Sequence, residues 1–454
     1  MSDLHPVEPG RVVVSSGAAD AAEAAGGPPL TKDASFWGMT ATQFLGAFND
    51  NLFKQLLLLL AIPVGAAAAT EEDAQGTATV VFSLPFVLFS GFAGFLSDRH
   101  SKTRVIVLSK VAEIAIMFLG AVAFYLYAST GYTGLLVVLF LMGAQSAFFG
   151  PGKYGILPEM LRESDLPRAN GIILMTTFLA IIFGTAAAGL LGDLVDPARP
   201  LVEGALRLSA GSMACVIIAI VGTATSLLIR RLPAAQPDLE FAWDEVVIPS
   251  AIRRLLWRDR PLLLALLASN MFWLVSGIAI PAVNSLGLVQ LGLNKTETSL
   301  LTATIGLGIA VGAVTAGRLS HGKADFRLMQ WGAWGLVGWL LLLAVPLPGG
   351  RHLLGFGGSL PALALLGASA GLFAIPVQVF LQTRAPDGLK GRMIATMNVT
   401  NFFAIAVAGV CYKAFDGVIQ VLGWPRSSMF AFMALLILPV AICYRPATGG
   451  ASTP

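Results

Sequence analysis

Apolar residues fill long stretches of the chain, and short polar connections separate these stretches. An α-helix needs about 20 apolar residues to cross the hydrocarbon core of a membrane, and each stretch is close to that length. The pattern predicts an all-α polytopic membrane protein with twelve transmembrane helices. The expected spans are 36–63, 77–97, 104–128, 133–150, 168–191, 208–230, 261–290, 298–319, 328–346, 353–376, 393–416 and 427–444.

The longest polar connection between spans divides the predicted helices into two sets of six. It covers 231–260 and is expected to be a cytoplasmic linker. The first six-helix bundle then occupies 34–230 and the second occupies 261–445. Residues 1–33 are rich in Ala, Gly and Pro, which predicts a disordered cytoplasmic tail, and 446–454 form a short C-terminal tail.

The positions of Lys and Arg predict how the chain is oriented in the membrane. The connections after helices 2, 4, 6, 8 and 10 hold 18 of these residues, whereas the connections on the other side hold 5. Basic residues are retained on the cytoplasmic side of membrane helices. Both termini are therefore expected in the cytoplasm.

Composition changes this picture little. The 454 residues are 56% hydrophobic and 12% charged, against about 25% charged in soluble domains. The net charge of +3 gives no reason to expect a nucleic-acid partner. The three cysteines are far apart, and the four histidines lack the spacing of metal ligands, so we expect neither a metal nor a cofactor.

A short motif occurs once in each half. Residues 94–104 read "GFLSDRHSKTR" and 317–327 read "GRLSHGKADFR", and both follow the second helix of their half. Three identical residues match at a constant offset of 223, which are the pairs Gly94 and Gly317, Ser97 and Ser320, and Arg104 and Arg327. Two parallel six-helix repeats around a central cavity are a transporter architecture.

The first copy of this motif resembles the loop 2–3 signature of the major facilitator superfamily. The resemblance implies a twelve-helix transporter with a gate in which an Asp pairs with a neighbouring helix. The second copy has His321 where the first has Asp98, which predicts a weaker second lock. The alternative is that these charges serve orientation only. The gating candidates are Gly94, Asp98, Arg99, Arg104, Lys153 and Arg318.

Two further stretches resemble the bacterial lysophospholipid transporters. They are "TQFLGAFNDNLFK" at 42–54 and "FFGPGKYGILPEMLRESDLPRANG" at 148–171. The resemblance implies a monomer in the bacterial inner membrane that moves lysophosphatidylethanolamine-type lipids to the cytoplasmic leaflet for re-acylation, with membrane lipids and a cytoplasmic acyltransferase as partners. It is strong in the first half and rests mainly on topology in the second. The long N-terminal tail departs from the family pattern.

Charged residues inside the first long apolar stretch predict the substrate site. Each charge at the centre of a membrane helix costs roughly 2.5–3.5 kcal/mol. Asp50 and Lys54 are four residues apart and share one helix face, with Asn49 and Asn51 beside them and Gln43 further along. A zwitterionic headgroup could place its ammonium at Asp50 and its phosphate at Lys54. The alternative is a buried pair that only neutralises itself.

Other polar residues in apolar stretches are candidates to line the cavity, or to join helices by hydrogen bonds. They are Glu113, Gln145, Asn270 and Asn398. Lys110 is expected to extend to the membrane interface. Gly308 and Gly312, four residues apart, predict a close helix contact.

Two other classes of function remain for comparison. A membrane acyltransferase of the glycerolipid type would need a His followed five residues later by Asp, and none of the four histidines has that spacing. A transporter of a soluble or amphiphilic substrate, with the same fold, stays open.

Overall fold

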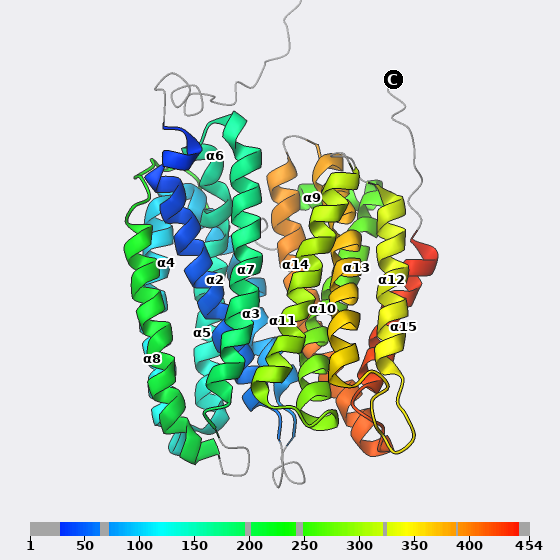
Figure 1. Cartoon of the computed structure of the whole chain (residues 1–454). Coiled ribbons are helices and arrows are strands. Elements are labelled where there is room, and N and C mark those ends of the chain that lie inside the picture. Colours follow the sequence, from blue (N-terminus) through cyan, green and yellow to red (C-terminus); the bar gives the residue numbers. More distant parts are fainter. Residues whose placement is uncertain are drawn as a thin grey trace, which may run out of the picture.

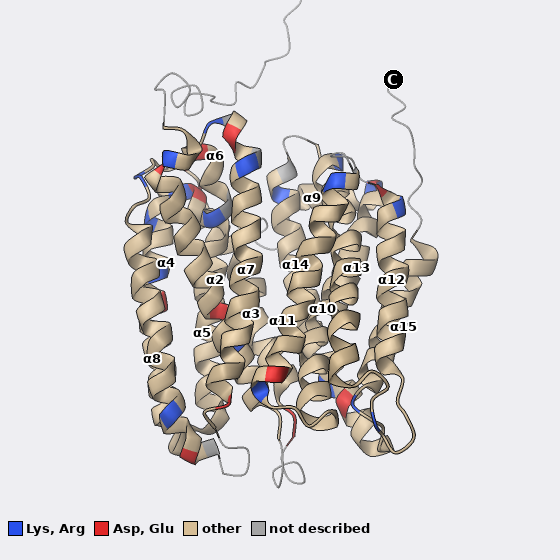
Figure 2. Cartoon of the chain, viewed as in Figure 1, with Lys and Arg blue, Asp and Glu red and all other residues tan. Residues whose placement is uncertain are grey.

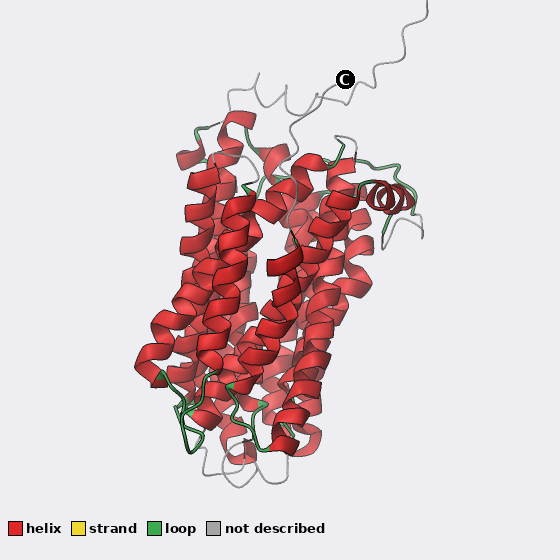
Figure 3. Cartoon of the chain, turned by 90° about the vertical axis from the view of Figure 1, so that its right-hand side faces the viewer, coloured by secondary structure: helices red, strands yellow, loops and turns green. Residues whose placement is uncertain are grey.

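The computed structural model describes residues 28–63, 72–195, 201–241, 248–320, 325–386 and 389–444. The regular elements in these ranges are helices (Figure 3). Most of the predicted N-terminal tail, the C-terminal tail 446–454 and His321 lie outside the described residues.

Ten helices in these ranges are long and apolar enough to cross a membrane. Helix α2 (Ala34–Leu60) and the shorter apolar helix α15 (Ser428–Cys443) run alongside them (Figure 1). The ten are α3 (Gln75–Arg99), α4 (Lys102–Tyr125), α5 (Tyr127–Gly155), α7 (Leu166–Gly192), α8 (Leu201–Ser226), α10 (Arg260–Ser285, extended by a π-helical turn over Leu286–Gln290), α11 (Lys295–Ser320), α12 (Phe326–Ala344), α13 (Gly355–Arg384) and α14 (Lys390–Leu422).

Four shorter helical pieces lie between or before the long helices. They are Leu30–Lys32, α6 (Leu157–Met160), Glu163–Asp165 and α9 (Ser250–Arg258). Helix α9 lies within the stretch expected to link the halves, just before α10. Its apolar residues Ile252 and Leu256 are buried.

The helices form two groups, each with its own apolar core. Helices α2 to α8 enclose one core, around residues such as Phe53, Phe124 and Leu139. Helices α10 to α15 enclose the other, around Phe272, Phe373 and Phe430. Figure 1 shows the two groups side by side, with the first in blue to green and the second in green to red.

The halves meet mainly through two helix pairs, α3 with α14 and α7 with α11, and α10 adds smaller contacts with α2 and α3. Glycines allow both contacts. A Cβ on Gly76 of α3 would lie 2.5 Å from the carbonyl oxygen of Gly409 on α14. A Cβ on Gly189 of α7 would lie 2.7 Å from the carbonyl oxygen of Lys295 on α11. Close backbone approach through small residues is how helices pack in membranes.

The described chain begins and ends at one end of the helix bundle, which we call the terminal end (Figure 1). We call the other end, where α2 stops, the opposite end. Charged residues gather near both ends of the long helices, and the stretches between are almost uncharged (Figure 2). This distribution is the one that a membrane requires.

Candidate substrate site

Helix α2 carries the charged residues of the first apolar stretch into the first half of the molecule. Asp33 begins the helix, and its side chain accepts hydrogen bonds from the backbone N–H groups of Ser35 (2.9 Å) and Phe36 (3.3 Å). Asp50 lies 16 residues after Ala34, which is about 24 Å along the axis at 1.5 Å per residue. It is therefore deep within the bundle.

Asp50 and Lys54 contact different neighbours. The Asp50 Oδ2 atom accepts a hydrogen bond of 2.5 Å from the Ser146 hydroxyl on α5, and its Oδ1 atom is buried with no hydrogen-bond partner among the described residues. The Lys54 ammonium lies 5.0 Å from the ring centroid of Phe82 on α3. No ion pair joins the two side chains in the described part of the chain, although both lie on one helix face.

The amide side chains beside Asp50 are used in helix packing. Asn49 is fully buried, and its amide donates to Glu113 on α4 (3.2 Å) and to the Cys215 carbonyl on α8 (2.9 Å). Asn51 donates to the Ala47 carbonyl of its own helix (2.8 Å). The Asn49 Oδ1 atom, like that of Asp50, has no partner among the described residues.

Gln43, one of the predicted site residues, joins two helices. Its amide donates to the carbonyl of Ile173 (3.1 Å) and the hydroxyl of Thr177 (2.9 Å), both on α7. The Thr177 hydroxyl also lies 3.0 Å from the Gln43 carbonyl oxygen. Since Gln43 is buried and its polar atoms are occupied, it holds α2 against α7 in this structure.

Glu113 forms an ion pair with Lys110 one turn earlier on α4. Both residues are 1% exposed. Glycines make room for the lysine: a Cβ on Gly46 of α2 would lie 3.1 Å from its nitrogen, and one on Gly222 of α8 would lie 3.0 Å away. The expectation that Lys110 extends to the membrane interface is wrong, because Glu113 neutralises it inside the bundle.

Two neighbouring residues of α5 lie between this ion pair and Asp50. The Gln145 amide is 3.5 Å from the Glu113 carboxylate, which is at the limit of a hydrogen bond. The Gln145 carbonyl oxygen is 3.2 Å from the Ser146 hydroxyl. Ser146 has one proton to donate, and its shorter contact assigns that proton to Asp50. Asp50, Asn49, Glu113 and Gln145 thus form one cluster with Lys110 and Ser146, which we call the polar cluster.

Sequence reasoning missed Ser146 as a member of the polar cluster. A lone serine in an apolar helix carries no distinguishing signal. Its one cue is its place directly after Gln145, in "GAQSAFFG".

The candidates from the second half lie outside the polar cluster. Asn270 on α10 is half-buried, and its Oδ1 atom has no partner among the described residues. Asn398 on α14 is exposed. Three residues later, Asn401 is buried and accepts a hydrogen bond of 3.1 Å from Ser269 on α10.

Among the predicted gating residues, Asp98 lies beside Lys102 at the terminal end. The ammonium of Lys102 is 2.5 Å from Glu159 and 3.5 Å from Asp98, and its stem packs against Gly155. Lys102 is 4% exposed, so the motif surrounds a buried cation that sequence reasoning did not select. The sequence feature that could have indicated Lys102 is its four-residue spacing from Asp98.

The other gating candidates have varied surroundings. The Arg99 guanidinium lies 5.7 Å from the ring centroid of Phe95. Lys153 is buried, and Arg104 and Arg318 are exposed. Gly94 is half-buried with open space where a Cβ would point.

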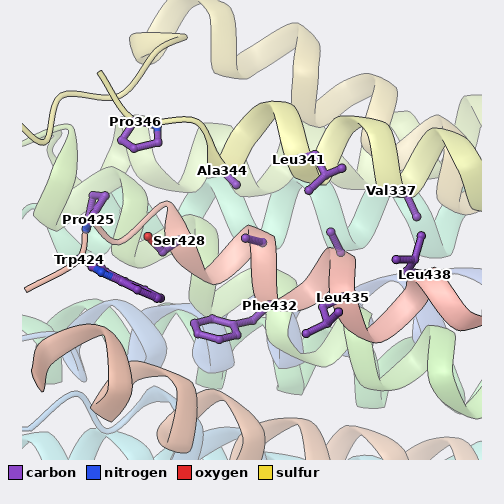
Figure 4. Close-up of a pocket in the computed structure, with 12 residues that line it drawn as sticks. Val337, Leu341, Ala344, Pro346, Trp424, Pro425, Ser428, Phe432, Leu435 and Leu438 are labelled. Carbon is purple, nitrogen blue, oxygen red and sulfur yellow. The ribbon is translucent and has the colours of Figure 1, made fainter. Parts of the chain in front are cut away.

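An apolar groove of about 630 Å³ lies on the second half, between α12 and α15. Figure 4 shows Leu341, Phe432 and Leu435 lining it, with Trp424 at one end. Because these helices belong to the other half, the groove is separate from the polar cluster.

The helical architecture and the buried polar cluster define a polytopic α-helical membrane protein with charged groups inside its first half. The family model described as "Major Facilitator Superfamily" matches residues 39–409. Among solved structures, the chain is similar in fold to a POT family transporter in complex with 5-aminolevulinic acid (TM-score 0.69, 13% identity, 90% of this chain and 95% of that one). It is also similar to a mutant of the nucleoside transporter NupG (TM-score 0.66, 12% identity, 90% and 98%).

Two relatives are more similar in sequence. The lysophospholipid transporter LplT of Escherichia coli O1:K1 / APEC is 30% identical over 381 residues, which cover 80% of this chain and 86% of that one. LplT of Enterobacter sp. (strain 638) is 29% identical over 372 residues, covering 80% and 83%. The chain therefore belongs to the Major Facilitator Superfamily and, within it, to the lysophospholipid transporter family.

Proposed function

We propose that this protein moves lysophosphatidylethanolamine-type lipids across the bacterial inner membrane to the cytoplasmic leaflet for re-acylation, by alternating access. The proposal rests on the contacts that the Asp50 and Lys54 side chains make. Deep in the bundle, Asp50 has one unpartnered oxygen among the described residues, and Lys54 contacts an aromatic ring instead of the carboxylate four residues away.

Two charges inside a membrane protein are costly unless something pairs with them. A zwitterionic headgroup carries an ammonium that suits Asp50 and a phosphate that suits Lys54, and both contacts are charge-assisted. Family relatives named as lysophospholipid transporters support this choice of substrate over a soluble one. The single acyl chain would lie against the apolar side chains that surround the polar cluster.

In this proposal Glu113 stabilises the residues around the site and does not contact the substrate. Its carboxylate already contacts Lys110 and Asn49, and it is 1% exposed. Asp50 is then the carboxylate left to meet the substrate.

We further infer that the terminal end faces the cytoplasm, as the distribution of Lys and Arg predicts. Asp98, Lys102 and Glu159 would then form part of the cytoplasmic gate, since they join the start of α4 to the segment after α5. The acyltransferase that uses the delivered lipid would meet this face.

The test is transport of a fluorescent lysophosphatidylethanolamine in proteoliposomes by Asp50→Ala, Lys54→Ala and the double variant, with the melting temperature of each. We expect Asp50→Ala to lower the rate at least tenfold while the protein stays folded and monodisperse. The double variant should remain stable and inactive, because a headgroup site needs both charges. Asp238→Ala, which removes an exposed carboxylate from the linker, is the matched control.

A self-neutralising pair makes the contrary forecast. Asp50→Ala would then leave an unpaired cation and cost about 3–5 kcal/mol, and the double variant would recover both stability and transport. Recovered transport would exclude a headgroup site at these residues. Movement of a soluble amphiphile by the protein, with no movement of the lipid, would favour a soluble substrate instead.

A further inference from the structure

The two main helix pairs between the halves carry polar contacts near the opposite end of the bundle. One set surrounds Asp73, which comes just before α3, and concerns the contact of α3 with α14. The other surrounds Asp193, which ends α7, and concerns the contact of α7 with α11. Neither carboxylate has a role in the function proposed above.

The buried carboxylate of Asp73 accepts hydrogen bonds from residues of three helices. It is 6% exposed, and it accepts hydrogen bonds from the Gln75 backbone N–H (2.9 Å), the Ser285 hydroxyl on α10 (3.1 Å) and the Tyr412 hydroxyl on α14 (2.8 Å). Hydrogen bonds to an ionised acceptor are roughly twice as strong as neutral ones. A residue of the first half is thus held by two hydroxyls of the second half.

Buried amides extend this contact across the halves. The Gln75 amide donates to the Tyr412 hydroxyl (3.0 Å), and its carbonyl oxygen accepts from the Asn284 amide on α10 (3.0 Å). The Asn284 carbonyl oxygen accepts from Gln55 on α2 (2.8 Å). Gln75 and Asn284 are fully buried, so separating the halves here would break several hydrogen bonds at once.

Asp193 caps a helix that belongs to the other half. Its Oδ1 atom accepts from the backbone N–H of Lys295 (2.9 Å), and its Oδ2 atom accepts from the N–H (3.0 Å) and the hydroxyl (2.5 Å) of Thr296. The first N–H groups of a helix have no partner within the helix, and an acidic group near them is stabilising. The start of α11 therefore takes part of its cap from the end of α7.

At the terminal end, each of the following ion pairs that the structure describes lies within one half. Lys102 with Glu159 and Arg230 with Asp33 lie within the first half, and Arg384 with Asp259 lies within the second. These contacts hold each half together without fastening one half to the other.

We propose that Asp73 and Asp193 form a lock that closes the opposite end and must open in each transport cycle. Packed interfaces change between discrete arrangements, and buried polar contacts between two rigid halves set the balance of those arrangements. The lock rests on the two-half fold and does not depend on the identity of the substrate.

The test measures how often the opposite end opens, by the labelling rate of a buried cysteine. Ser299→Cys is the reporter, because Ser299 is fully buried at the contact of α7 with α11 and its hydroxyl has no partner among the described residues. The background carries Cys411 and Cys443 as serine and keeps the buried Cys215 as an internal standard. The purified protein is labelled with a maleimide in nanodiscs.

Tyr412→Phe keeps the ring but removes the hydroxyl that donates to Asp73. Asp193→Asn removes the negative charge that caps the start of α11. Each should raise the labelling rate of the reporter roughly tenfold, which corresponds to about 1.4 kcal/mol. The double variant should multiply the two effects, as expected for separated sites. The matched control is Glu72→Gln, which removes an exposed ion pair with Lys413 at the same end and should change the rate less than about twofold.

Two results would overturn the lock. One is an unchanged labelling rate in the double variant. The other is an equal rise at Cys215, which is 1% exposed inside the first half, because general loosening would then explain the effect. The labelling assay needs no lysophospholipid, so a failed lock and a failed lipid substrate are distinguishable.

Discussion

Buried charges in the first half are accommodated in two different ways. Lys110 and Glu113 neutralise each other, and glycines on α2 and α8 leave space for the lysine stem. Asp50 and Lys54 contact separate partners instead and leave one carboxylate oxygen unpartnered in the described structure. The first pair is neutralised within the bundle, and the second is the pair that we propose for the headgroup.

Removing one partner of the Lys110–Glu113 pair should destabilise the protein. Glu113→Gln leaves a buried, unpaired ammonium, and we expect a loss of about 3–5 kcal/mol, seen as a lower melting temperature. The double variant Lys110→Met/Glu113→Leu keeps similar volume and should recover most of the stability, since buried ion pairs are often replaced by apolar residues without loss. A single variant as stable as the wild type would show that the pair is not formed.

Spacing alone can indicate these residues, but it cannot assign their partners. Asp50, Glu113 and Gln145 stand out in the sequence because polar groups are costly in apolar helices. Four-residue spacing places Asp50 and Lys54 on one face, yet the neighbours on α5 and α3 determine where each side chain points. Ser146 and the burial of Lys110 depend on contacts between helices far apart in sequence, which no local pattern reveals.

At the scale of helices, small residues decide which ones meet. The predicted close contact at Gly308 and Gly312 is confirmed, because a Cβ on either would collide with the backbone of α13 at Ala364 or Ala368. The same device joins the halves at Gly76 and Gly409. Without side chains at these points, the helix backbones approach directly.

Gly409→Ala should weaken the contact of α14 with α3. The added Cβ would collide with the Gly76 carbonyl oxygen, and overpacking of this kind costs about 1–3 kcal/mol. Gly417→Ala on the same helix is the control, because open space surrounds its Cβ position, and alanine there should be neutral or stabilising by up to about 1 kcal/mol. Thermal unfolding of both variants gives the comparison, and equal melting temperatures would contradict the close contact.

At the scale of the whole molecule, hydropathy predicts the membrane-spanning helices better than their ends. Helix α14 is predicted over 393–416 but covers Lys390–Leu422, and α8 is predicted over 208–230 but covers Leu201–Ser226. Both helices begin before their predicted spans, because hydropathy marks the part of a helix that lies in the membrane and the helix itself starts in polar surroundings. The apolar stretch of α8 continues past the end of the helix at Ser226. Helix α5 starts before its predicted span because a second helical segment joins it across Gly131, which has φ of +57°.

The direction in which the molecule lies in the membrane can be tested with two cysteines. Glu72 and Asp238 are both exposed, the first near the opposite end and the second in the stretch between the halves. The excess of basic residues predicts a cytoplasmic position for Asp238 and a periplasmic one for Glu72. In a background with Cys443 replaced by serine, an impermeant maleimide should label Glu72→Cys in intact cells. Asp238→Cys should react only after the membrane is opened.

The reverse pattern would invert the orientation, and it would place the lock formed by Asp73 and Asp193 on the cytoplasmic side. Labelling of both sites in intact cells would contradict the predicted topology, because an odd number of membrane crossings must separate the two positions if they lie on opposite sides.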